Sequence, residues 1–150
     1  MVDTEIIGDR PKNISKKETM KLLEWTYDML KLKRFKYLEM VVRFDKNLRN
    51  VDKVFGYCIW EDDYIKPREF EIGVDANLSY AMVRKTIFHE MIHVKQYASE
   101  MLKDRGDHNF WNGVSYRRGF YKDSELPWEQ EAYIMEEFLY DEWRKYKKHN

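Results

Sequence analysis

Two histidines stand four positions apart in this chain of 150 residues, at His89 and His93, and Glu90 directly follows the first. On a helix, side chains four residues apart lie one above the other on a single face, so both imidazoles can reach one metal ion. Glu90 is rotated from His89 by about 100° and can approach a water held by that metal without being a ligand. The spacing therefore predicts a metal site, with zinc as the metal and Glu90 beside the water that the metal holds.

The surrounding sequence distinguishes this site from an accidental pair of histidines beside a surface acid. The chain has only four histidines, and this pair lies in a run where apolar residues recur at three- and four-residue steps from Val83 to Met101. That periodicity is typical of a helix, and Ser79 supplies a capping residue ahead of it. We therefore predict that a helix over residues 79–101 carries the motif, and we favour the metal site over coincidence.

A catalytic zinc ion usually has three protein ligands and an open fourth position. Cys58 is the single cysteine and a poor candidate by itself, so the third ligand is expected to be a nitrogen or a carboxylate oxygen. The residues themselves leave His108, Glu129 and Glu131 open as the main candidates, followed by the other carboxylates of the chain. Both acids stand at the start of the predicted last helix, where an acid also favours the helix dipole without any metal.

The motif and a later segment together resemble a known group of enzymes. Residues 127–133 read Pro-Trp-Glu-Gln-Glu-Ala-Tyr, and Glu129 follows His93 by 36 positions. This arrangement is similar to the small zincin metallopeptidases that use a glutamate ligand (gluzincins). It is especially similar to the short metallopeptidases encoded by bacteriophages and grouped with SprT-like proteins. The resemblance spans about residues 70–133 and covers the first third of the chain only in outline.

The resemblance implies a role for each residue of the motif. In gluzincins the third ligand precedes a small residue by three positions, which Glu129 with Ala132 matches and Glu131 does not. The resemblance thus implies that His89, His93 and Glu129 bind Zn²⁺. It also implies that Glu90 acts as acid and base while a peptide bond of a peptide or protein substrate is hydrolysed.

SprT-like proteases depart from this chain at one point. They resemble it through the motif but take a third histidine from a His-Gly-x-x-Phe segment, whereas Asn-Phe-Trp follows His108 here. Two functions of other kinds also stay open. One is a binding or scaffold protein whose zinc is closed by a fourth ligand, His108 or Glu131, and the other is a SprT-like protease that acts near nucleic acid.

The substrate contacts are less well defined by the sequence. An extended peptide could add main-chain hydrogen bonds along the strand predicted at residues 70–74, if that strand forms a sheet edge. The developing oxyanion needs a hydrogen-bond donor. The candidates, among which the sequence does not choose, are Tyr116, Tyr121, His108 and Tyr133.

Composition limits the partners. The 27 Lys and Arg residues balance the 27 Asp and Glu residues, so no global basic field is present to hold a phosphate backbone. This balance argues against a nucleic-acid partner and leaves only local clusters at residues 31–34, 117–118 and 145–148. No apolar stretch approaches the roughly 18 residues of a membrane span, and the start lacks the layout of a signal peptide. We expect a soluble cytoplasmic protein, in the host cytoplasm if it is a phage protein, with no membrane partner.

The elements that must position these residues form one expected α+β domain over residues 1–150, with residues 1–13 loosely held. A first helix is predicted at about residues 15–34, from a capping Ser15. Strands are predicted at residues 38–44, 54–60 and 69–74, joined by turns that suit antiparallel pairing. A hairpin is predicted around Asn112-Gly113, and a last helix has Pro127 in its first turn. The predicted fold is zincin-like, with a small, mainly antiparallel, three-stranded sheet.

Overall fold

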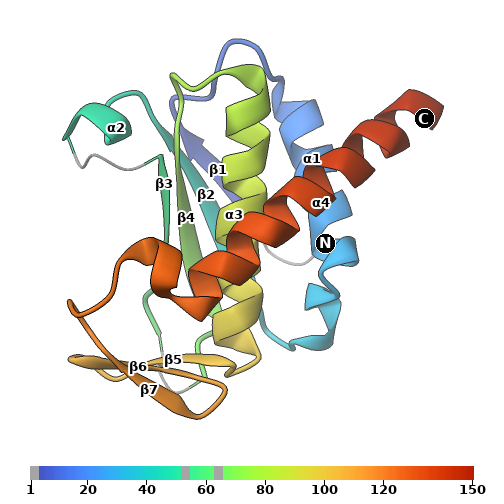
Figure 1. Ribbon diagram of the computed structural model, residues 1–150. Coiled ribbons are helices and arrows are strands. Elements are labelled where there is room, and N and C mark those ends of the chain that lie inside the picture. The colour runs from blue at the N-terminus through green and yellow to red at the C-terminus, as the bar shows by residue number, and fades with distance from the viewer. Residues whose placement is uncertain (1–3, 52–54, 63–65) are drawn as a thin grey trace.

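The computed structural model describes residues 4–51, 55–62 and 66–150 (Figure 1). Over these residues the chain forms an α+β fold of four α-helices and two small sheets. No helix in these ranges has the length and apolar composition needed to cross a membrane. In chain order the elements are β1 (Thr4–Gly8), α1 (Lys16–Met29), β2 (Glu39–Asp45), α2 (Leu48–Val51), β3 (Gly56–Trp60), β4 (Glu69–Asp75), α3 (Tyr80–Ala98), β5 (Leu102–Asp104), β6 (His108–Trp111), β7 (Val114–Arg117) and α4 (Pro127–His149), with short 3₁₀ turns at Leu32–Arg34 and Asp123–Glu125.

The larger sheet, sheet A, has the strand order β1-β2-β4-β3 and is mixed. β1 pairs with β2 and β2 pairs with β4 in parallel, while β3 pairs with β4 antiparallel. The prediction of a mainly antiparallel, three-stranded sheet is therefore wrong. It assumed that strands adjacent in sequence pair, whereas β2 bypasses β3 to pair with β4 and α1 provides the crossover that a parallel β1–β2 pair requires.

Strand β1 lies in the segment that we expected to be loosely held. Residues 4–8 instead pair along β2, with Thr4 opposite Met40 and Gly8 opposite Phe44. The first three residues of that segment lie outside the described ranges, as do residues 52–54, which include the first residue of the strand expected at 54–60.

The two predicted helix starts are confirmed, and both helices end earlier than expected. The Ser15 hydroxyl accepts a hydrogen bond from the Glu18 N–H, and the Ser79 hydroxyl accepts one from the Met82 N–H. α1 ends before Lys31, whose φ of 55° turns the chain into the left-handed region. α3 ends at Ala98 rather than at residue 101, because the chain turns and enters β5.

The smaller sheet, sheet B, contains the predicted hairpin. Asn112 and Gly113 have φ values of 49° and 83°, as a two-residue hairpin turn with two positive φ angles requires. β5 pairs with β6 on the other side and adds a third antiparallel strand that we did not predict. The last helix begins at Pro127 as predicted.

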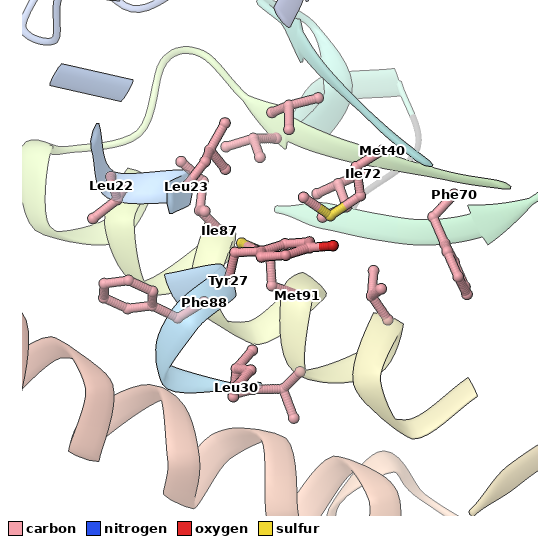
Figure 2. Packing of buried hydrophobic residues seen from close by; sticks show 14 of the residues in the cluster. Leu22, Leu23, Tyr27, Leu30, Met40, Phe70, Ile72, Ile87, Phe88 and Met91 are labelled. Carbon is pink, nitrogen blue, oxygen red and sulfur yellow. The ribbon is translucent and has the colours of Figure 1, made fainter. Parts of the chain in front are cut away.

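The core lies between sheet A and the helices on one of its faces, and α3 occupies its centre (Figures 1 and 2). α3 packs against β3, β4, α1 and α4. Thirteen of its residues are buried, so its position is held on several sides. Figure 2 shows the side chains that fill the space between these layers, which include Leu22, Leu23, Tyr27 and Leu30 of α1, Met40 of β2, Phe70 and Ile72 of β4, and Ile87, Phe88 and Met91 of α3.

Candidate metal centre

Both histidines of the motif lie on the face of α3 that meets α4. His89 and His93 are buried, with their ring centroids 4.8 Å apart. α4 supplies Glu129 in its first turn, two residues after Pro127, whose fixed φ suits a helix start. The contact between α3 and α4 therefore brings together residues that are 36 to 40 positions apart in the chain.

The three predicted ligands converge on one point. Oε1 of Glu129 lies 3.0 Å from Nε2 of His89 and 2.9 Å from Nε2 of His93. One donor atom from each of the three residues lies within 4.8 Å of the others, and within the described ranges no further residue joins this group. Two ligands of a tetrahedral zinc ion stand about 3.3 Å apart, so these separations fit a shared metal.

The donor set also fits a cation chemically. His89 has a carboxylate at each ring nitrogen, Glu129 at Nε2 and Glu136 at Nδ1, the latter 2.8 Å away. Each carboxylate needs a proton or a cation between it and the ring nitrogen that it faces. Either both nitrogens of His89 are protonated, or Nδ1 is protonated and Nε2 binds a cation that it shares with Glu129. Two imidazole nitrogens and one carboxylate oxygen form a set that zinc commonly accepts in catalytic sites.

The outer ring nitrogens are held by two residues that we did not predict. Nδ1 of His89 lies 2.8 Å from Oε1 of Glu136, and Nδ1 of His93 lies 2.7 Å from Oε1 of Gln96. Partners of this kind orient an imidazole ligand and set which nitrogen bears the proton. The spacing of Glu136, seven residues and about two turns after Glu129, is the sequence signal from which it could have been predicted.

The carboxylates and imidazoles strongly perturb each other's proton affinity. Burial lowers the pKa of His89, but its hydrogen bonds to Glu129 and Glu136 outweigh this and raise the pKa to about 10. Burial raises the pKa of Glu129, yet the hydrogen bonds from His89 and His93 lower it to about 2. Glu129 is therefore ionised over the whole neutral range, as a metal ligand must be.

Glu90 is one of the residues that line a pocket between α3, α4 and β3. Burial raises its pKa to about 7, against the opposing charges of His93 and His89. A methyl group placed on Gly56 of β3 would lie 3.1 Å from Oε2 of Glu90, so this carboxylate points toward β3. The pocket has a volume of about 520 Å³ and includes both histidines, Glu90 and Glu129 in its walls. We refer to it as the central pocket.

The other two candidate ligands are engaged elsewhere. His108 is partly exposed on β6, does not line the central pocket, and lies beside Asp107 with 3.0 Å between Nδ1 and Oδ1. Glu131 accepts a hydrogen bond of 3.1 Å from Gln96. Cys58 of β3 does line the pocket, but it is outside the three-residue donor group, and burial raises the pKa of its thiol.

Of the four candidate oxyanion donors, the structure brings one to the central pocket. Tyr133 lines it, and its ring lies 4.7 Å from that of His89. Tyr116 instead packs edge-on against Trp128 and Tyr121, with ring centroids 5.5 Å and 5.4 Å away. Neither Tyr116, Tyr121 nor His108 lines the pocket.

The strand expected to receive a peptide is not a sheet edge. β4, at residues 69–75, lies between β2 and β3, so its main-chain groups are already paired on both sides. The edge beside the central pocket is β3, three of whose residues, Gly56, Tyr57 and Cys58, line it. The expectation that residues 70–74 form a sheet edge is therefore wrong.

No protein-family profile, no curated protein and no solved structure matches this chain.

Proposed function

We propose that this protein is a zinc-dependent metallopeptidase of the gluzincin kind. His89, His93 and Glu129 would hold the zinc ion, and Glu90 would transfer the proton. The observation that carries the proposal is that Nε2 of both histidines faces the same oxygen of Glu129 in the wall of a pocket that also contains Glu90. Two facing helices thus supply a catalytic donor set and a carboxylate outside it.

A zinc ion held there would act as a Lewis acid that polarises a scissile carbonyl group and lowers the pKa of water. Glu90 would accept a proton from the attacking water on its carboxylate and return it to the leaving amine nitrogen. The hydroxyl of Tyr133, on the α4 side of the pocket, would donate a hydrogen bond to the carbonyl oxygen as negative charge develops on it.

An extended peptide would bind along β3. This strand is paired on one side only, and it enters the wall of the central pocket at Gly56. Main-chain hydrogen bonds at such an edge bind a peptide without regard to most of its side chains. The position of Glu90, directed toward β3, would place the proton-transfer group next to the backbone of that peptide.

The surroundings of the donor group favour an open site over a closed structural one. A closed tetrahedral site needs a fourth protein ligand. Among the described residues the group has three members, and the two candidates for a fourth, His108 and Glu131, are hydrogen-bonded elsewhere. The remaining side of the group faces the central pocket.

The test combines metal analysis with hydrolysis of a diverse peptide library followed by mass spectrometry. We expect one zinc ion per chain and cleavage of extended peptides. The Glu90→Gln variant should retain the zinc ion and lose the cleavage. Undiminished cleavage by Glu90→Gln would disprove the mechanism, and a wild-type chain that binds zinc but cleaves nothing would favour a non-catalytic role.

A further inference from the structure

We propose that Gln96 is a positioning residue of the metal centre, which fixes the orientation of His93 and anchors the start of α4. This inference rests on the proposed function, because it assumes that His93 and Glu129 are metal ligands. One buried amide would thus position two of the three proposed ligands, His93 and Glu129.

Gln96 lies at the interface between α3 and α4 and is almost completely buried, with 1% of its surface exposed. Its side-chain oxygen lies 2.7 Å from Nδ1 of His93, on the same helix. Its side-chain nitrogen donates to the main-chain oxygen of Trp128 at 3.0 Å and to Oε1 of Glu131 at 3.1 Å. All the hydrogen-bonding atoms of the side chain thus face polar partners.

These partners allow one orientation of the amide. A main-chain carbonyl and a carboxylate both accept hydrogen bonds only, so the group that faces them must be the NH₂ of Gln96. Its oxygen must then face His93, which requires a proton on Nδ1 of that imidazole. A neutral His93 in this state carries its lone pair on Nε2, the nitrogen that faces Glu129 at 2.9 Å. Gln96 therefore selects the tautomer that can bind the metal.

The same side chain holds the helix that supplies the third ligand. Trp128, whose main-chain oxygen accepts from Gln96, directly precedes Glu129. Glu131, the second acceptor, lies two residues after it. The amide therefore forms hydrogen bonds with the first turn of α4 on both sides of Glu129. Glu136 orients the other imidazole from a position seven residues after Glu129 on α4.

The first test is the Gln96→Leu variant, measured by competition titration with Zn²⁺ alone. Removal of an outer partner of a metal ligand typically costs 10- to 100-fold in affinity, so we expect a loss of about that size. In the zinc-loaded wild type, the proton on Nδ1 of His93 should give a slowly exchanging NMR signal, and Gln96→Leu should lose it. Gln130→Leu is the matched control, because Gln130 is an exposed amide in the same turn that bonds the Ser124 oxygen. It should keep both properties.

A second pair of variants covers the case in which Gln96→Leu fails to fold. Gln96→Glu keeps an acceptor for His93 but sets a carboxylate against Glu131, so zinc affinity should fall about tenfold. Adding Glu131→Gln supplies an NH₂ group in place of that repulsion and should restore part of the affinity, while the Trp128 oxygen still lacks its donor. The His93 signal should persist in both variants, because each keeps an acceptor for Nδ1, and a merely structural role would not produce the recovery of affinity.

The outcomes separate the two proposals. A wild-type chain that binds no zinc contradicts the proposed metal site, and the role of Gln96 falls with it. A folded Gln96→Leu variant with wild-type zinc affinity and an unchanged His93 signal contradicts the role of Gln96 alone. Failure of Glu131→Gln to restore affinity to Gln96→Glu would likewise overturn it. None of these results depends on the identification of a peptide substrate.

Discussion

Glu136 and His89 are joined by a contact of 2.8 Å between Oε1 and Nδ1, and the same imidazole faces Glu129 through its other nitrogen at 3.0 Å. Both carboxylates come from α4, seven residues apart, which places them on one face of that helix. Between them lies Ala132, which is fully buried and lets α4 approach α3 closely. One helix face therefore flanks a single ring of the facing helix on both sides.

Replacement of Glu136 should weaken zinc binding without abolishing it. In Glu136→Gln the amide oxygen can still accept from Nδ1 of His89 but the charge is lost, so we expect about a tenfold loss of affinity. Glu136→Leu, which removes the acceptor, should lose about 100-fold. The measurement is competition with a chromophoric chelator. Glu137→Gln, a change at an exposed neighbour paired with Lys85, should leave the affinity unchanged. Equal affinity in wild type and Glu136→Leu would contradict the assigned role.

The identity of the third ligand can be tested by three matched substitutions. Glu129→Gln should lower zinc affinity by more than about 100-fold, since it removes a ligand rather than an outer partner. Glu131→Gln keeps an acceptor for Gln96 and should retain zinc, as should His108→Ala on β6, outside the central pocket. Metal content after dialysis distinguishes the three. Zinc loss in His108→Ala with retention in Glu129→Gln would reverse the assignment.

The ion pair between Glu18 and Arg84 should make the fold sensitive to acid. The Arg84 side chain is fully buried, and its guanidinium lies 2.7 Å from Glu18. Burial would raise the pKa of Glu18, but hydrogen bonds from Arg84 and Tyr80 prevail and lower it below 4.5. A carboxylate whose pKa is lowered by folding contributes stability above its unfolded pKa, and this stability is lost as the pH falls through the folded pKa. The free energy of unfolding should therefore decrease as the pH falls below about 5.

Urea unfolding of Glu18→Ala measures the size of this contribution. The variant leaves the buried guanidinium of Arg84 without its carboxylate, which should cost about 3 kcal/mol at pH 7. Because the variant lacks the titrating group, its stability should fall less steeply with acid than that of the wild type. Glu24→Ala, at an exposed acid of the same helix, should change the free energy by less than about 0.5 kcal/mol. Parallel acid profiles for wild type and Glu18→Ala would show that another group causes the effect.

A side chain at Gly56 should impair turnover more than metal binding. The added methyl group of Gly56→Ala would lie 2.6 Å from a Thr86 methyl group, 2.7 Å from the main-chain oxygen of Gly73 and 3.1 Å from Oε2 of Glu90. Because the Gly73 main-chain oxygen is held in the sheet, β3 and Glu90 must shift to make room. We expect this to lower the free energy of unfolding by about 1–3 kcal/mol. We expect a lower kcat with unchanged zinc content, because the ligands lie on α3 and α4.

A second glycine provides the control for that variant. Gly113, in the hairpin turn, has a φ of 83° and nothing within 4 Å of an added methyl group. Gly113→Ala should cost about 1–2 kcal/mol from backbone strain and leave kcat unchanged. A Gly56→Ala variant with the turnover of Gly113→Ala would show that Glu90 does not depend on this close approach.

The features that the sequence predicted are local ones. The start of α3 at Ser79 and of α4 at Pro127 follow from capping and backbone restrictions that act within one turn, and the hairpin follows from Asn112-Gly113. The sheet order was not predictable in the same way, because the parallel pairing of β2 with β4 joins strands that β3 separates in sequence. Gln96 was missed because its partners on α4 are known only once α3 and α4 are packed.

β3 has five residues, and in the proposed peptidase this shortness would affect the release of products. A strand of that length can add only a few main-chain hydrogen bonds to a peptide, each worth a net 0.5–1.5 kcal/mol or about 1 kcal/mol on average. Cleavage beside Glu90 would divide those bonds between two fragments, so each fragment would be held more weakly than the intact peptide. A short edge strand would thus bind the intact peptide more tightly than the cleavage products. The products would then dissociate readily after each reaction.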